Sequence, residues 1–255
     1  MNKILRFLSF LCGVAVLVLS LLCVSAQTTS PAVTTNPSAA SKPAAKVVRL
    51  DRFESSINKF EKKDKESLPP PGGVLFVGSS TFTKWTELEE DLKEFHAINR
   101  GFGGSTAPEV LHYMDRIVFP YKPATIVTYF GTNDLAGGRS PQQLADDFKT
   151  FVERVQKRLP GVPIYCIPPN PAPAREKWVA EYAQAGTLLQ EYIAKTPGLY
   201  FIDPRPLMKD AKGQHRMELY MSDKLHMNRQ GYELWIPVIK KALQEKTSTT
   251  APAPH

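Results

Sequence analysis

The chain has 255 residues, of which 42% are hydrophobic and 22% are charged, with 15 Gly and 22 Pro. These fractions exclude a collagen, a coiled coil and a wholly disordered chain, and the length permits a large buried core. The net charge is +7 at pH 7. No dense run of Lys and Arg is interleaved with aromatic residues, so the sequence does not indicate nucleic-acid binding.

The first residues have the pattern of an export signal. Lys3 and Arg6 form a short basic region, Phe7–Val24 carries no charge, and Ser25 and Ala26 are small. This pattern predicts a cleaved signal peptide over residues 1–26 and a periplasmic or secreted protein without stable membrane insertion. The uncharged stretch exceeds the usual length of about 7–15 residues. An uncleaved membrane anchor is therefore a second interpretation.

The composition divides the rest of the chain. Residues 27–48 are rich in Thr, Pro and Ala, contain no aromatic residue, and predict a disordered linker. Residues 247–255 predict a similar tail. One folded domain is then expected over residues 49–246.

The chain has only three cysteines that could form disulfide bonds. Cys12 and Cys23 leave with the predicted signal peptide, so Cys166 is the single cysteine of the mature chain. No intramolecular disulfide is then possible. Cys166 lies in an apolar run, which predicts a buried and unreactive thiol.

Short apolar runs alternate with helical patterns along the predicted domain. Runs of this kind are typical of strands buried on both faces, and here they are Val74–Val77, His96–Ile98, Thr125–Phe130, Pro163–Ile167 and Leu199–Ile202. Helices are predicted over Leu50–Phe60, from capping boxes at Thr106 and Ser140, and over Glu176–Ala194 and Arg229–Leu243. Five strands alternating with helices predict an α/β fold, a three-layer α/β/α sandwich with a mainly parallel five-stranded sheet.

Polar motifs follow several of the predicted strands. In a parallel sheet, ligands bind at the carboxyl ends of the strands. The motifs are Gly78-Ser79-Ser80, Asn99 to Gly104, Gly131-Thr132-Asn133-Asp134 and, before the last helix, Asp223-Lys224-Leu225-His226. Each motif alone is also compatible with a turn or a helix cap.

Together the motifs supply the parts of one reaction. A serine hydroxyl needs a base to become a nucleophile, and the base needs a carboxylate that orients it. Asp223 and His226 are three residues apart, so one turn can place both on the same side. A Gly amide, an Asn side chain and the amide of Ser80 could stabilise an oxyanion.

The same four motifs, in this order, resemble those of the SGNH (GDSL-type) hydrolases, and the resemblance extends from about Leu50 to Leu243. The chain is most similar to the branch of platelet-activating-factor acetylhydrolase catalytic subunits and lysophospholipase-like esterases. The resemblance implies a flavodoxin-like fold with Ser80 as nucleophile, Asp223 and His226 completing the triad, and Gly104, Asn133 and Ser80 forming the oxyanion hole. Ser79 stands where the family usually has Asp, which affects local packing and not the nucleophile.

Other chemistries fit less well. A dinucleotide-binding fingerprint starting at Gly101 would need Gly at position 106, which is Thr. The sequence has no cluster of metal ligands, so we expect neither metal nor cofactor. A non-enzymatic carbohydrate-binding module on an inactive esterase fold is the alternative class; it would predict loss of Ser80, His226 or an oxyanion residue, and all are present.

The substrate is the least determined feature. No long apolar lid or membrane-binding amphipathic helix is visible, which favours a short acyl group, such as O-acetyl, on a carbohydrate or another polar alcohol. A lysophospholipase or acyl-thioesterase acting on lipid is the alternative. Trp178 could stack on a sugar or pack a helix. The sequence does not indicate the oligomeric state.

Overall fold

The computed structural model describes residues 50–249, and the side chains up to residue 245. These residues belong to one compact unit, Val47–His255. The predicted signal peptide, the linker and the last residues of the predicted tail lie outside the described part. Between residues 50 and 249, no helix is long and apolar enough to cross a bilayer.

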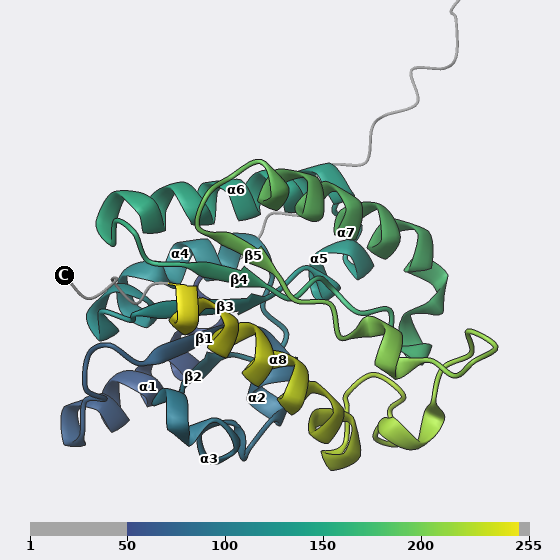
Figure 1. Cartoon of the computed structure of the whole chain (residues 1–255), viewed down its shortest axis with the longest axis horizontal. Helices are drawn as coiled ribbons and strands as arrows, with labels where there is room; N and C mark the ends of the chain where they lie inside the picture. The colour runs from purple at the N-terminus through teal and green to yellow at the C-terminus, as the bar shows by residue number, and fades with distance from the viewer. Residues whose placement is uncertain (1–49, 250–255) are drawn as a thin grey trace, which may run out of the picture. The chain divides into compact units, whose positions relative to one another are not determined.

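A five-stranded sheet forms the centre of the unit (Figure 1), in the order β2-β1-β3-β4-β5. All four neighbouring pairs are parallel, so the prediction of a mainly parallel sheet is confirmed. This is the strand order of flavodoxin-like folds. The strands are β1 (Val74–Gly78), β2 (Ile98–Gly101), β3 (Thr125–Tyr129), β4 (Ile164–Cys166) and β5 (Leu199–Phe201).

Helices cover both faces of the sheet, which gives the predicted three layers. Alternate strand residues point to opposite faces, so Leu75 and Val77 enter one apolar cluster, and Val74 and Phe76 enter another. Helices α1 (Glu54–Glu66), α4 (Ala107–Ile117), α6 (Pro141–Arg158) and α7 (Val179–Ala194) contribute to the first cluster. Helices α2 (Ser80–Lys84), α3 (Leu88–Asp91) and α8 (Arg229–Thr249) contribute to the second. Figure 1 shows α6 and α7 on one side of the strands and α8 on the other.

Both predicted capping boxes are present. Thr106 and Glu109 cap α4, and Ser140 and Gln143 cap α6, each with Pro in the first turn. The remaining short elements are α5 (Thr132–Ala136), η1 (Lys93–Phe95), η2 (Phe119–Tyr121), η3 (Pro173–Trp178), η4 (Arg205–Met208) and η5 (Met217–Leu219).

The second strand is displaced from its prediction. His96 ends η1 with a φ of 50° instead of starting a strand, and β2 begins at Ile98. Asn99 and Arg100, the first polar residues of the Asn99 to Gly104 motif, therefore lie within β2. Arg100 is only 1% exposed, and it is accommodated because its guanidinium donates to Asp64 at 2.5 Å and to the Tyr121 hydroxyl at 2.6 Å.

Two predicted helix starts are also wrong. Helix α1 starts at Glu54, and Leu50 is 37% exposed instead of lying on its buried face. Helix α7 starts at Val179 because the residues before it form the separate 3-10 helix η3, which begins with Pro173.

Candidate active site

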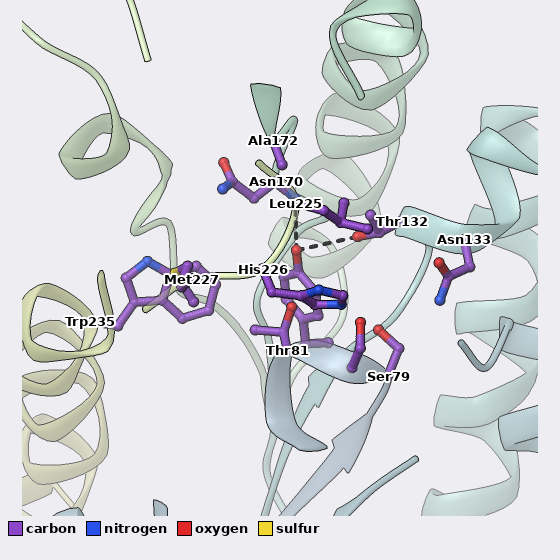
Figure 2. A pocket seen from close by; sticks show the side chains of 12 residues that line it. Ser79, Thr81, Thr132, Asn133, Asn170, Ala172, Leu225, His226, Met227 and Trp235 are labelled. Carbon is purple, nitrogen blue, oxygen red and sulfur yellow. Dashed lines mark hydrogen bonds between the residues drawn. The ribbon is translucent and has the colours of Figure 1, made fainter. Parts of the chain in front are cut away.

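A small cavity lies where the carboxyl end of the sheet meets the turn before α8. The centre of a water molecule can occupy about 20 Å³ of it. Figure 2 shows the side chains around it. Its lining residues come from five separate segments and are Ser79, Ser80, Thr81, Tyr129, Thr132, Asn133, Asn170, Ala172, Leu225, His226, Met227 and Trp235.

Ser80 reaches this cavity through a tight turn between β1 and α2. A Cβ at Gly78 would lie 2.0 Å from the Tyr129 carbonyl oxygen, so glycine is required where the two strands approach. The Ser79 amide donates to the same carbonyl at 3.1 Å. Ser79 is buried and Ser80, the first residue of α2, is half-buried. Its hydroxyl therefore stands at a strand end and not in the core.

Asp223 and His226 form a hydrogen-bonded pair in the turn before α8. Asp223 Oδ2 lies 2.7 Å from His226 Nδ1, while Asp223 Oδ1 accepts from the amides of Leu225 and His226 at 2.9 and 3.0 Å. Burial alone would raise the pKa of Asp223, but these hydrogen bonds from His226 and Leu225 lower it to about 2. The carboxylate thus stays ionised at neutral pH and leaves Nε2 as the free ring nitrogen of His226.

Asn133 lies in α5 on the other side of the cavity (Figure 2). Its Nδ2 donates one hydrogen bond to the Ser105 carbonyl at 3.0 Å. The second N–H of this amide is not used by that bond. The contact holds the side chain in place and ties α5 to the loop that follows β2.

The loop after β2 lies beside Ser80. A Cβ at Gly103 would be 3.7 Å from the Ser80 Cβ. Gly104 has a φ of +85°, which favours glycine, and it is not among the residues that line the cavity. The structure therefore brings Ser80, His226 and Asn133 to one cavity, with Asp223 behind His226 and Gly104 in the adjoining loop.

Asp134 makes a second connection between α5 and this loop. Its Oδ1 accepts from the Ala107 amide at the start of α4, at 2.9 Å. The side chain is fully buried, and burial raises its pKa to about 7, although the Ala107 amide and Arg139 oppose this effect. Asn133 and Asp134 together fix α5 against residues 105–107.

The polar residues Tyr129 and Asn170 line the cavity but were not singled out from the sequence. The Tyr129 hydroxyl accepts from the Thr132 hydroxyl and from the backbone N–H of Asn170, each at 3.2 Å. Asn170 also donates to the Tyr220 hydroxyl at 3.4 Å. Asn170 follows β4, so a search for polar residues after every strand would have found it. Trp235 could not have been found this way, because α8 brings it to the cavity.

Other predicted features are placed as follows. Cys166 is buried, as predicted, and burial raises the pKa of its thiol to about 12. Trp178 packs against the first apolar cluster, and the charged ends of Arg175 and Lys177 lie over its ring. Among residues 50–249, no group of His, Cys, Asp and Glu could hold a metal ion.

The fold is of the parallel α/β class and carries a polar cavity at the carboxyl ends of its strands. The chain belongs to the GDSL-like lipase/acylhydrolase family, whose pattern it matches over residues 74–234, and it is therefore an ester-hydrolysing enzyme. The expected family and fold are therefore confirmed. Among curated proteins, the comparison found no match.

Solved structures with the same fold are numerous. A protein from Streptococcus pneumoniae named for platelet-activating factor superposes with a TM-score of 0.68 at 21% identity, covering 76% of this chain and 94% of that one. An acylhydrolase from Bacteroides fragilis gives 0.64 at 22% identity, covering 78% and 97%. An acetyl xylan esterase gives 0.56 at 18% identity, covering 67% and 98%. At these identities the similarity shows the fold.

Proposed function

We propose that this enzyme is an exported serine esterase that hydrolyses short acyl esters, such as O-acetyl esters, of carbohydrates or other polar alcohols. One observation carries the proposal. Ser80, His226 and Asn133, which come from three distant parts of the sequence, line one cavity, and Asp223 binds Nδ1 of His226 and leaves Nε2 free. Such an arrangement supplies a nucleophile, a base, an orienting carboxylate and an oxyanion donor.

The proposed reaction proceeds through an acyl-enzyme. The Ser80 hydroxyl attacks the ester carbonyl carbon while Nε2 of His226 takes its proton. The Ser80 and Gly104 amides and the Asn133 side chain stabilise the negative oxygen of the tetrahedral intermediate. His226 then gives the proton to the departing alcohol, and a water molecule, activated by the same imidazole, releases the acid and restores Ser80.

The dimensions of the cavity favour a short acyl group. The centre of a water molecule can move within about 20 Å³ of the cavity, so the cavity holds about one or two water molecules. Tyr129 and Trp235, both nearly inaccessible to solvent, form part of its wall. The acetyl xylan esterase with this fold is compatible with acetyl removal from a polysaccharide. The predicted signal peptide supports export, and N-terminal sequencing of the exported protein should find Gln27 first.

A substrate panel tests the proposal. It contains p-nitrophenyl esters from acetate to palmitate, acetylated xylan and lysophosphatidylcholine. We expect kcat/KM to be highest for acetate, Ser80→Ala to abolish hydrolysis, and a serine-directed phosphonate to label Ser80 alone. A preference for long chains or lysophosphatidylcholine would favour the lipid-hydrolase alternative. Binding to xylan without hydrolysis of any ester would indicate an inactive carbohydrate-binding module.

A further inference from the structure

Arg175 differs from every other arginine in the described residues. The sequence has ten arginines between residues 50 and 249. Nine of them lie within ion-pair distance of a carboxylate, and Arg175 alone does not. Its Nε is buried without an acceptor. Among residues 50–249, no hydrogen bond joins the Arg175 guanidinium to a protein acceptor.

The segment that carries Arg175 borders the active-site cavity. Ala172, just before η3, lines that cavity, and the Arg175 amide donates to the Ala172 carbonyl at 2.7 Å. The Ala174 amide donates to the Lys224 carbonyl at 2.9 Å, in the turn that carries His226. On its other side η3 contacts α5, the helix of Asn133. The segment that carries Arg175 thus contacts both the turn of His226 and the helix of Asn133.

Local charges leave this border positive. Glu176, the acid next to Arg175, is 2.7 Å from Nε2 of His215 and is engaged there. Asp223 is engaged by His226. Lys177 and Lys224 have no carboxylate within ion-pair distance among the described residues. Three cations, Arg175, Lys177 and Lys224, therefore outnumber the two carboxylates of this border, and none of the three lies within ion-pair distance of a carboxylate in the described residues.

Trp178 fixes the position of the guanidinium. Cζ of Arg175 lies 5.6 Å from the centre of the Trp178 ring, within the range of a cation–π contact. Nζ of Lys177 lies 5.4 Å from the same centre. The ring is thus occupied by protein cations, which argues against sugar stacking there. An arginine held in this way loses less conformational freedom when it binds a ligand.

We infer that Arg175 binds an anionic group, a carboxylate or a phosphate, on the alcohol part of the ester substrate. The inference rests on the proposed function, since it places the alcohol part of the substrate beside η3. A guanidinium binds either group through paired hydrogen bonds, which gives direction as well as affinity. Esters of acidic sugars and of phosphorylated alcohols are the substrate classes that meet this requirement.

Matched acetate esters test the inference. 4-Acetoxybenzoate and 4-acetoxyphenyl phosphate carry the anion, and 4-acetoxybenzamide is the neutral counterpart. We expect the native enzyme to prefer at least one anionic ester. Arg175→Gln should lower kcat/KM for that ester about tenfold, mainly through KM, and change the neutral ester less than about twofold. Arg175→Lys should recover part of the loss, and the two anionic esters distinguish carboxylate from phosphate.

Lys177→Gln is the control, because it removes one charge from the same helix and the same aromatic ring. It should change the anionic ester less than about twofold. Equal losses of kcat/KM for the two variants would show that the anionic ester responds only to the net positive charge of this region, which overturns the role of Arg175. Equal losses for the anionic and neutral esters would show a structural role instead, which also overturns the inference.

Binding to the Ser80→Ala variant separates this inference from the proposed function. Calorimetry with 4-hydroxybenzoate and 4-hydroxyphenyl phosphate should show binding that Arg175→Gln removes. If this binding is found but the native enzyme hydrolyses no ester, the anion site stands and the proposed function fails. If the neutral ester is hydrolysed but neither anionic compound binds nor is preferred, the proposed function stands and the anion site is wrong.

Discussion

The guanidinium of Arg52 donates to the carbonyl oxygen of Gly104 at 2.9 Å, across 52 positions of the chain. The same guanidinium forms a bidentate ion pair with Glu109, the fully buried residue of the α4 capping box. Glu109 in turn accepts from the amide and the hydroxyl of Thr106 at 2.8 and 2.7 Å. A residue before the first helix therefore stabilises the loop that carries a proposed oxyanion donor.

Arg52→Met is expected to lower kcat about tenfold with little change in KM, because a misplaced Gly104 amide weakens only the transition state. Arg116→Met is a suitable control. Arg116 lies in α4 and forms ion pairs with Glu54 and Glu61 of α1, at 2.8 and 2.6 Å, but it has no hydrogen bond to Gly104. The Arg116→Met variant should have a lower Tm and an unchanged kcat. An Arg52 variant whose folded fraction keeps full kcat would contradict the prediction.

Removing the Asn133 amide should affect turnover more than substrate binding. Loss of one oxyanion donor usually costs about 10²–10³-fold in kcat, and we expect that loss for Asn133→Ala with a nearly unchanged KM. Asn133→Asp keeps the size but removes both N–H groups, so it should be equally impaired. Because Asn133 also binds the Ser105 carbonyl, Tm must be measured. A lower Tm with unchanged kcat would show that Asn133 is only structural.

In the proposed catalytic pair, His226→Ala should be more damaging than Asp223→Asn. The first removes the proton acceptor, and the second removes only its orientation and charge stabilisation. The pKa of Asp223 is about 2, so the carboxylate should remain ionised from pH 8 down to about pH 4. Its contribution to stability is present above the pKa of an unfolded Asp, near 4, and is lost between about pH 4 and pH 2. Rates for the two variants, measured with the same ester, check the order.

The Asp134 carboxyl should make stability depend on pH in the direction opposite to that expected from Asp223. Burial raises its pKa to about 7, so the folded protein retains a proton that the unfolded chain loses near pH 4. Stability should therefore fall as the pH rises from about 4 to 7, by about 4 kcal/mol at most. Asp134→Asn removes this dependence and should gain in Tm relative to the native protein between pH 4 and pH 8. A Tm difference that is constant over this range would contradict the prediction.

The thiol of Cys166 should resist modification while the protein is folded. Its pKa of about 12 leaves almost no thiolate at pH 8, and the residue is buried. Labelling of the mature protein by a disulfide reagent should be slow in buffer and complete in denaturant. Rapid labelling of the folded protein would place Cys166 at the surface.

The sequence alone was sufficient for the fold class and for part of the candidate site. A strand that is buried on both faces is a short apolar run in the sequence. The four strands other than β2 were found because nearly all of their side chains are apolar. Capping boxes were found because their hydrogen bonds join residues only three positions apart. Ser80, Asn133 and the Asp223–His226 pair were found because parallel strands end at one edge, where polar motifs are conspicuous.

Tertiary contacts decided the rest. Strand β2 was misplaced because Arg100 is tolerated in a buried strand only through Asp64 and Tyr121, which are distant in sequence. Trp235 reaches the cavity only when α8 packs against the sheet. The contact between Arg52 and Gly104 and the unpaired state of Arg175 depend on which side chains meet after folding. Local patterns carry no information on such pairings, because they arise from segments that approach each other only in the folded chain.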